Sequence, residues 1–308
     1  MCIRDRLGPE AVLSAVDNEG FQCDGRMLEM NIFENRVYQL GTEDGGMLIA
    51  KFYRPGRWSD AAILEEHAFA LDLAAQDIDL VPPLTDSNGS TLRVFGPYRF
   101  ALFERRGGRS PDFEDAEQLR QLGRFIGRLH AIGKKERYQH RPTLDVTTFG
   151  SECAGFLLEH DFIPTELIPA YESLTQDLIQ RVTWCYERCP DLKLIRTHGD
   201  CHRGNILWTD DGPHMVDLDD SRMAPAVQAL PAPASPAPAS TSMSAPPLST
   251  TASGMSTSPS SSAMPVPDGI ASGMIVVADV AVPADRGQIA QGPRGGELTQ
   301  AGSGIVAF

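Results

Sequence analysis

A polar segment at residues 198–220 constrains the fold of this chain more than any other feature. It begins with His-Gly-Asp-Cys-His-Arg-Gly-Asn-Ile-Leu-Trp and ends with Val-Asp-Leu-Asp-Asp at residues 216–220. Asp200, Asn205 and Asp217 therefore follow one another within about twenty residues. Magnesium-dependent phosphoryl transfer needs such a set, because one carboxylate orients and deprotonates the acceptor hydroxyl while an amide oxygen and a second carboxylate hold Mg²⁺ against the nucleotide phosphates. The segment predicts a kinase-type active site.

The same segment predicts a loop followed by a β-hairpin. Asp200 and Asn205 lie on a glycine-containing loop, so their side chains can converge on one point. Residues 205–208 and 214–216 read as two short strands joined by a turn that contains an Asp-Gly pair. The hairpin would return Asp217 to the side of Asn205.

The segment permits two other interpretations. Asp, Asn and Gly are common turn residues, so the pattern also suits an ordinary turn. His198, Cys201 and His202 belong to the residue types that bind zinc. No second Cys/His cluster follows nearby at a suitable spacing, so phosphoryl transfer is the favoured interpretation.

The chain resembles the bacterial stress response kinase A family, Ser/Thr protein kinases built on the choline kinase or aminoglycoside phosphotransferase variant of the kinase fold. The polar segment carries the likeness, and so do four stretches in the family's order: residues 34–39, 51–58, 63–71 and 140–143. The likeness runs from about residue 7 to residue 228. It implies an α+β, bilobal protein-kinase-like fold, with the N-lobe at residues 7–103 and the hinge with a truncated C-lobe at residues 104–228.

The resemblance implies a role for each polar residue of the segment. Asp200 is the expected catalytic base. Asn205 and Asp217 are expected to hold Mg²⁺, with Asp217 also counted as catalytic, and ATP is the expected phosphoryl donor. Asp219 and Asp220 are expected either to support a second metal or to solvate the loop, and we favour solvation for Asp220.

The resemblance also implies a lysine that binds phosphates. Residues 27–40 and 47–53 read as two strands, and Lys51 lies near the end of the second. Such a lysine would reach the α and β phosphates and be held by a carboxylate of the next helix. We expect Glu66 to be that partner, with Glu65 as the alternative.

Three helices are predicted from apolar spacing. The first follows a cap at Ser59 or Asp60, and its inward positions are Ile63, Glu66, Phe69, Ala70 and Leu73. The second covers residues 115–135, starts with a capping box, and has Leu119, Leu122, Ile126 and Leu129 on one face. The third covers residues 169–187. We expect the apolar face of the second helix to form core.

Nucleotide contacts are expected at a turn and at a hinge. The sequence contains no glycine-rich phosphate loop in its N-lobe, and the resemblance places the phosphates under the turn at residues 31–35, where backbone N–H groups would bind them. Family members tend to have Ser where this chain has Ile32, so one hydroxyl donor would be missing. Residues 98–103 followed by 104–109 suit either the interlobe hinge, which pairs with adenine, or a plain edge strand with its loop.

Both ends of the chain differ from the family. Residues 1–6 lack the apolar run of a signal peptide, and we interpret them as a tag or an assembly artefact. Residues 229–308 form an Ala, Pro, Ser, Thr and Gly tract without Lys, Trp or Tyr, in which Phe308 is the only aromatic residue. Such a tract has too little bulky apolar surface to offset the entropy of ordering, so we expect disorder and favour a shifted reading frame over a genuine linker.

Composition restricts the compartment and the partners. Six cysteines without a paired framework, and no apolar run long enough to span a bilayer, predict a reduced, cytoplasmic protein. A formal charge of −14 disfavours nucleic acid and anionic membranes as partners. We expect a monomeric kinase that acts on Ser/Thr hydroxyls of proteins. The alternatives are a small-molecule kinase of the same fold, acting on an aminoglycoside, choline or homoserine, and an inactive truncated pseudokinase.

Overall fold

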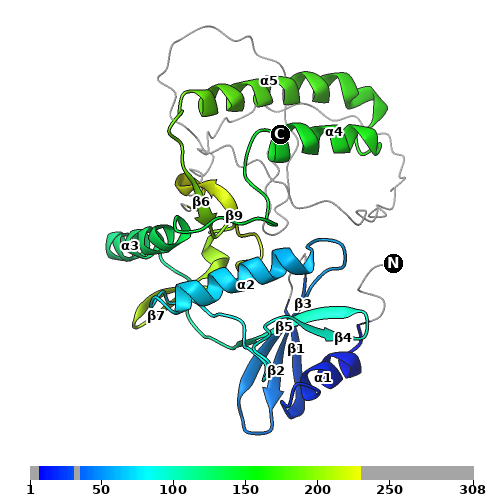
Figure 1. The fold of residues 1–308 in the computed structure, drawn as a ribbon, viewed down its shortest axis with the longest axis vertical. Coiled ribbons are helices and arrows are strands. Elements are labelled where there is room, and N and C mark those ends of the chain that lie inside the picture. Colours follow the sequence, from blue (N-terminus) through cyan, green and yellow to red (C-terminus); the bar gives the residue numbers. More distant parts are fainter. Residues whose placement is uncertain (1–6, 31–34, 230–308) are drawn as a thin grey trace, which may run out of the picture.

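The structure is a computed structural model that describes residues 7–30 and 35–229. The expectations for residues 1–6, for Ile32 and for residues 230–308 concern positions outside the described residues. Within the described ranges, a β-sheet lies at one end and a pair of helices at the other, with two small sheets between them (Figure 1).

The first part of the chain folds into an antiparallel sheet with two helices. Its elements are α1 (Pro9–Asp17), β1 (Cys23–Met30), β2 (Arg36–Thr42), β3 (Met47–Phe52), α2 (Asp60–Ala74), β4 (Arg93–Phe95) and β5 (Tyr98–Glu104). The five strands are arranged in the order β1-β2-β3-β5-β4. Helix α1 packs on this sheet, and the two share one apolar core.

The expectation of a single strand over residues 27–40 was wrong. The stretch contributes to both β1 and β2, and Met30 lies opposite Val37 in an antiparallel register. The turn that the family resemblance places at residues 31–35 lies within this stretch, and it was not used to divide the strand. The second predicted strand, residues 47–53, is confirmed as β3.

Helix α2 has the cap and the buried face that its sequence predicts. Ser59 is the N-cap residue, and its hydroxyl accepts a hydrogen bond from the N–H of Ala62 at 3.2 Å. All five predicted inward positions are buried: Ile63, Glu66, Phe69, Ala70 and Leu73. The helix therefore presents a carboxylate, Glu66, to the interior.

The second part of the chain is helical, with short strands near its end. Its elements are α3 (Ala116–Gly133), η2 (Thr147–Ser151), α4 (Glu152–Glu159), η3 (Thr165–Leu167), α5 (Ile168–Glu187), β6 (Leu194–Thr197), η4 (Arg203–Asn205), β7 (Ile206–Thr209), β8 (Gly212–Met215), β9 (Arg222–Pro225) and η5 (Ala226–Ala229). Strand β6 pairs with β9 and β7 pairs with β8, both antiparallel.

Helix α3 confirms its predicted start and most of its predicted face. The carboxylate of Asp115 accepts the N–H of Glu117 at 2.8 Å, and Gln118 returns a side-chain bond to it at 3.3 Å. Three of the four predicted apolar residues are buried: Leu122, Ile126 and Leu129. Leu119 is 44% exposed, contrary to the prediction, because it lies in the first turn of the helix, where the neighbouring residues are also exposed.

Helices α4 and α5 lie together at the top of Figure 1 and bury few side chains. The helix predicted over residues 169–187 is confirmed as α5. Its only buried residue among those described is Thr175, and Leu174 and Trp184 are exposed. None of the helices within residues 7–30 and 35–229 is both long enough and apolar enough to cross a membrane.

An apolar core joins α2, α3 and the β7–β8 hairpin. Phe69 and Leu73 of α2 share this core with residues of α3 and with Ile206 and Met215 of the hairpin. The backbone N–H of Met215 also donates to the carbonyl of Asp79, at 3.1 Å, in the segment that follows α2. The hairpin that carries the polar segment is therefore fixed to both parts of the chain.

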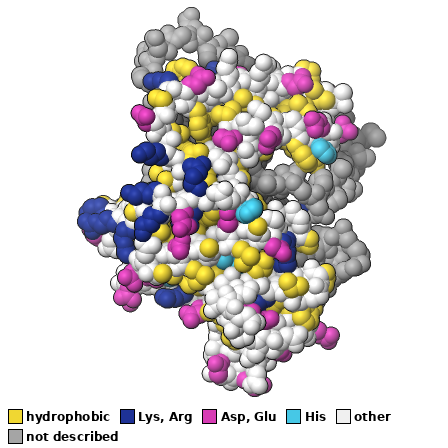
Figure 2. Space-filling model, in the orientation of Figure 1, with side chains coloured by type: hydrophobic (Ala, Val, Ile, Leu, Met, Phe, Trp, Pro, Cys, Tyr) yellow, Lys and Arg dark blue, Asp and Glu magenta, His cyan; other side chains and the backbone are white. Residues whose placement is uncertain are grey.

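Positive charge is concentrated over α3. Figure 2 shows Lys and Arg side chains gathered on the left, where Figure 1 has this helix. Arg120, Arg124 and Arg128 are exposed and spaced four residues apart, so they form one row along α3. The acidic composition of the whole chain therefore does not describe this part of its surface.

Candidate active site

A cleft of about 380 Å³ opens between the sheet and the β7–β8 hairpin. Val37 and Ile49 line it from the sheet, and Leu207 and Met215 line it from the hairpin. Lysine and carboxylate side chains line the cleft too. Two apolar walls with a polar end suit a ligand that has a flat aromatic base and a charged tail, because the base displaces water from both walls.

The segment after β5 connects the five-stranded sheet to the β7–β8 hairpin, and it does not follow an edge strand. Strand β5 lies between β3 and β4, so it is not at the edge of the sheet. Arg109 exchanges two backbone hydrogen bonds with Trp208 of β7, at 2.9 and 2.8 Å. Residues 104–108 line the cleft between these two anchors. This is the location expected of an interlobe hinge.

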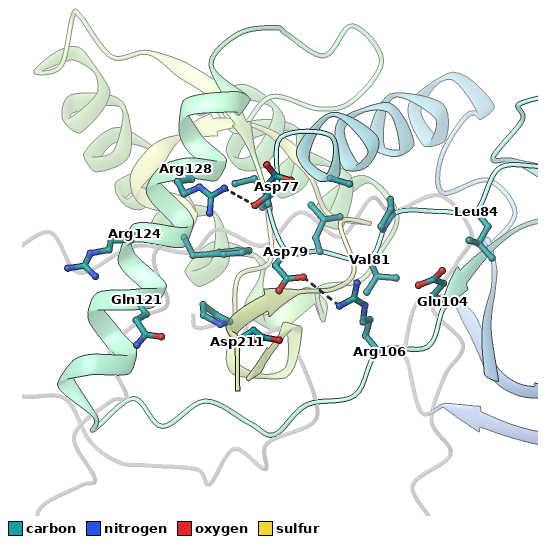
Figure 3. A pocket seen from close by; sticks show the side chains of 16 residues that line it. Asp77, Asp79, Val81, Leu84, Glu104, Arg106, Gln121, Arg124, Arg128 and Asp211 are labelled. Carbon is teal, nitrogen blue, oxygen red and sulfur yellow. Dashed lines mark hydrogen bonds and ion pairs between the residues drawn. The ribbon is translucent and has the colours of Figure 1, made fainter. Parts of the chain in front are cut away.

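A larger and more open cavity of about 820 Å³ lies beside the cleft (Figure 3). The guanidinium of Arg106 lies 3.8 Å from the carboxylate of Asp79, and Arg128 of α3 donates to the carbonyl oxygen of Asp77 at 2.7 Å. The lining thus contains both arginines and carboxylates, so it does not favour ligands of one charge. Four wall residues are shared with the cleft: Leu80, Val81, Glu104 and Arg106.

His198 fixes the loop that begins the polar segment. Its ring is fully buried, and Nε2 donates to the carbonyl oxygen of Val216 at 3.0 Å. The other ring nitrogen accepts the N–H of Asp200 at 3.3 Å. Burial lowers the pKa of His198, which keeps the ring neutral in this role. His198 thus ties the loop to the strand that returns toward it.

Asp200 is held as a carboxylate. The amide group of Asn205 donates to its backbone oxygen at 3.0 Å and to its Oδ2 at 3.2 Å. His202 Nε2 lies 3.3 Å from the same Oδ2. Burial alone would raise the pKa of Asp200, but the hydrogen bond from His202 and nearby positive charge, including that of Arg222, together lower it. A carboxylate that is ionised at neutral pH can accept a proton from a hydroxyl.

Asp217 returns to the loop as the hairpin pattern predicts. The N–H of Val216 donates to the carbonyl oxygen of Asn205 at 3.1 Å, which places Asp217 directly after the residue paired with Asn205. Asp217 has a φ of +61°, a left-handed conformation that Asp tolerates better than most residues other than glycine. The chain can therefore turn at this position and direct the carboxylate toward the cleft, whose lining includes Asp217.

Lys51 contacts Asp217 and not the carboxylate that sequence reasoning assigned to it. Its ammonium lies 2.8 Å from Asp217 Oδ1 and 3.1 Å from Asp219 Oδ1. Burial would lower the pKa of Lys51, but these two carboxylates raise it well above its usual value, so the lysine is charged. The expected Lys51–Glu66 partnership does not take the form of a direct ion pair: Glu66 Oε2 lies 3.6 Å from Arg141 Nη1, and Glu66 interacts with Lys51 electrostatically.

The alternative partner, Glu65, has a different task. Its carboxylate accepts the backbone N–H groups of Gln139, His140 and Arg141, at 2.6, 2.8 and 3.0 Å. These residues belong to the segment that follows α3. Glu65 therefore fastens that segment to α2 and does not reach the cleft lysine.

Asp219 and Asp220 take part in a cluster of ion pairs, contrary to the expectation of solvation. Asp219 lies 2.6 Å from Arg57 Nη1, in addition to its contact with Lys51. Asp220 lies 3.0 Å from Arg57 and 3.0 Å from Arg222. Asp219 is desolvated, yet the nearby cations lower its pKa. Burial raises the pKa of Asp220. Both carboxylates hold arginines and neither solvates the loop.

The donors near Asp217 suit a magnesium ion that also binds phosphates. The NH₂ group of Asn205 points to Asp200, which leaves its Oδ1 as the amide atom available to a metal. Mg²⁺ in phosphoryl-transfer sites is bound through one or two carboxylates with phosphate oxygens and water, and needs no complete protein cage. The described part of the chain has no cluster of three or more His, Cys, Asp or Glu side chains placed to hold an ion. Asn205 and Asp217 fit the group.

The zinc interpretation of the polar segment does not fit the geometry. Both ring nitrogens of His198 are engaged within the loop. One ring nitrogen of His202 accepts the N–H of Gly204 at 2.8 Å, and the other faces Asp200. Burial raises the pKa of the Cys201 thiol to about 12, whereas zinc takes a thiolate.

The Glu66 carboxyl predicts a pH dependence of stability. Burial raises its pKa from 4.5 to about 7, against the charges of Lys51 and Arg141. The folded chain therefore holds a proton that the unfolded chain has released, so stability from this group is present below about pH 4.5 and is lost as pH rises through about 7. The free energy of unfolding of the parent, relative to Glu66→Gln, should fall over this window. Urea unfolding of both proteins at a series of pH values checks this, and a constant difference would contradict it.

Arg57 and Arg141 are site residues that sequence reasoning missed. Each lies within a stretch that resembles the family, 51–58 or 140–143. Arginines are common on protein surfaces, and only the fold shows that these two side chains are buried. The sequence did offer one signal, because both arginines lie inside stretches that resemble the family. It did not show which groups they contact.

The comparisons identify the family. A model described as the phosphotransferase enzyme family matches residues 31–230. The chain belongs to this family. This phosphotransferase is 40% identical over 224 residues to stress response kinase A of Escherichia coli (strain K12). The matched region covers 73% of this chain and 67% of that protein. It is 39% identical, with the same coverage, to the serine/threonine protein kinase RdoA of Salmonella typhimurium (strain LT2). The predicted resemblance is confirmed.

Solved structures confirm the fold of the phosphotransferase. Amicoumacin kinase hAmiN in complex with AMP-PNP, Ca²⁺ and Ami has a TM-score of 0.55 and 19% identity, over 73% of this chain and 68% of that one. The microcompartment-associated aminopropanol kinase has a TM-score of 0.50 and 18% identity, over 69% and 70%. At these identities the likeness shows the fold alone, and it agrees with the expected kinase-like α+β architecture.

Proposed function

We propose that this phosphotransferase is an ATP- and Mg²⁺-dependent kinase that phosphorylates Ser/Thr hydroxyls of proteins. The observation that carries the proposal is the meeting of Asp200, Asn205, Asp217 and Lys51 beside a cleft with apolar walls. The names of the relatives, stress response kinase A and serine/threonine protein kinase RdoA, support a protein acceptor.

Each of these side chains has a task that follows from its surroundings. Asp200 is ionised and accepts the proton of the acceptor hydroxyl at a carboxylate oxygen. Lys51 is charged and buried, so it binds phosphate oxygens strongly. Asn205 and Asp217 hold Mg²⁺, which when bound neutralises charge on the phosphates. Residues 104–108 line the part of the cleft where a hinge backbone would pair with adenine.

The cysteines of the chain bear on its cellular setting. The five cysteines within the described residues are all free thiols. Free cysteines without a disulfide framework suit a reducing compartment, so we place the kinase in the cytoplasm. We expect it to act as a monomer.

A labelling experiment tests the acceptor. The purified full chain is incubated with Mg²⁺ and γ-phosphate-labelled ATP, together with dephosphorylated casein, an aminoglycoside or choline. The similar structures of kinases that act on amicoumacin and on aminopropanol make the small-molecule arms necessary. We expect label on Ser or Thr of protein. Label only on a small molecule would overturn the protein acceptor, and nucleotide binding without transfer to any acceptor would indicate the truncated pseudokinase.

A further inference from the structure

Arg141 lies where α2 meets the segment that carries Asp217. Its guanidinium donates to the carbonyl oxygen of Ser221 at 2.6 Å and to that of Ala62 at 3.2 Å. A third bond goes to the carbonyl oxygen of Asp219. We call residues 217–221 the metal loop. The side chain of Arg141 thus donates hydrogen bonds both to α2 and to two carbonyl groups of the metal loop.

The same guanidinium is stacked and buried. It lies 4.3 Å from the centre of the Trp58 ring, and Arg57 lies 5.4 Å from the same ring. Arg141 is 4% exposed, so its charge is compensated inside the protein by the carbonyl dipoles and by Glu66 at 3.6 Å. Arg57 in turn lies against the carboxylates of Asp219 and Asp220.

The backbone of Arg141 is fixed from the other side. The carboxylate of Glu65 accepts the N–H groups of residues 139–141. Glu65 and Ala62 are both on α2, so the helix holds this arginine by its main chain and by its side chain. The guanidinium then has a fixed position from which it can hold the metal loop.

We propose that Arg141 is a positioning residue that sets the metal loop against α2, and thereby fixes Asp217 for the metal–nucleotide complex. The proposal rests on the proposed function and extends it to a residue that does not touch the cleft. The direct ion pairs of Lys51 are with the metal loop, and its interaction with Glu66 of α2 is electrostatic without a direct contact. Direct hydrogen bonds from one side chain to both α2 and the loop come from Arg141.

The chemistry of arginine explains why this residue type is needed. The three carbonyl acceptors surround one planar group, and a guanidinium presents five N–H donors in a fixed fork. A lysine has one ammonium on a flexible stem and cannot meet acceptors from both elements at once. Asp217 lies on the same short loop as these acceptors, and the N–H of Asp219 donates to its Oδ1 at 3.3 Å, so bonds that hold Asp219 and Ser221 also restrict Asp217.

Nucleotide affinity measured with and without metal tests the proposal. The full-length chain and its Arg141→Met variant are titrated with a non-hydrolysable ATP analogue, first with EDTA and then with excess Mg²⁺. The variant should bind the metal-free analogue as the parent does, because Lys51 and the apolar walls remain. The tightening produced by Mg²⁺ should decrease about 10-fold or more, the usual cost of removing a residue that orients a metal ligand.

Arg196→Met is the matched control. Arg196 is also 4% exposed and lies 4.4 Å from an aromatic ring, that of Phe69, but its ion pairs are with Asp72 and Glu136. This variant should lower the melting temperature and keep the full effect of Mg²⁺. Arg141→Lys should resemble Arg141→Met, since one ammonium cannot replace the fork.

Each outcome bears on one proposal. If Arg141→Met melts lower but keeps the parent's response to Mg²⁺, the residue is only structural and the positioning role is overturned. If Arg196→Met loses the response equally, the effect is general destabilisation and the role is again overturned. If the parent itself binds no nucleotide, or binds it with no response to Mg²⁺, the proposed function fails independently of Arg141.

Discussion

Replacing Asp200 with Asn should lower the rate of phosphoryl transfer about 10²- to 10⁴-fold, the range that general-base catalysis contributes. The amide has the same shape, but it cannot accept the proton of the acceptor hydroxyl. Binding of Mg²⁺ and nucleotide should change little, because Asn205, Asp217 and Lys51 provide those contacts. The measurement is the initial rate of transfer from labelled ATP, with the nucleotide dissociation constant measured on the same sample.

Asp210→Asn is the matched control for this substitution. Asp210 lies in the turn between β7 and β8, its side chain is fully exposed, and its only described ion pair is a 3.9 Å contact with Arg109. The control should retain the parent's rate, since an exposed ion pair contributes little. A parent-like rate for Asp200→Asn would show that another group accepts the proton. An equal loss of nucleotide affinity would show that the substitution had disturbed the loop.

The parts of the site that are close together in sequence could be predicted from the sequence. The loop from His198 to Asn205 and the hairpin that follows are local structures, and glycine, turn residues and strand residues mark each step. The return of Asp217 to Asn205 follows from the register of a hairpin. The same holds for α2, where the Ser59 cap and the apolar spacing determine which face is buried.

The parts that depend on long-range packing could not be predicted in this way. Lys51 is 166 positions from Asp217, and no pattern within a helix shows that this carboxylate is nearer to the lysine than Glu66 is. The three carbonyl groups that bind Arg141 are invisible in the sequence, because every residue has a carbonyl. Charge in Asp219 and Asp220 was visible, but Arg57, which pairs with both, lies 163 positions from Asp220 in the sequence.

Helices α4 and α5 contribute little to the core that supports the cleft. The match to the curated relatives covers 67% of their length. Of the described residues in α4 and α5, only Thr175 is buried, so these helices are held by few core contacts. The cleft and its polar residues instead rest on the core shared by α2, α3 and the β7–β8 hairpin. The proposed nucleotide site therefore rests on the core of α2, α3 and the β7–β8 hairpin, which is better packed than α4 and α5.

Replacing Gly199 with Ala should both destabilise the chain and lower the rate of transfer on the order of 10²-fold. Gly199 has a φ of +84°, which costs an L-residue about 1–2 kcal/mol. An added Cβ would also overlap the backbone carbonyl of Asp220, and no side-chain rotation can relieve that contact. Forcing the two segments apart adds about 1–3 kcal/mol, so we expect a total loss of roughly 2–5 kcal/mol in the free energy of unfolding.

The rate of transfer by Gly199→Ala should fall by more than the increase in the unfolded fraction can explain. The overlap pushes the metal loop away from the loop at residues 198–205, which carries Asp200. A displacement of about 1 Å costs on the order of 10² in rate. Gly127→Ala is the control, because Gly127 lies on the exposed side of α3 with open space around it, and alanine should stabilise that helix by roughly 0.5–1 kcal/mol. Urea unfolding and initial rates of both variants give the comparison. Parent-like stability in Gly199→Ala would mean that the close approach of Gly199 to Asp220 does not hold in solution.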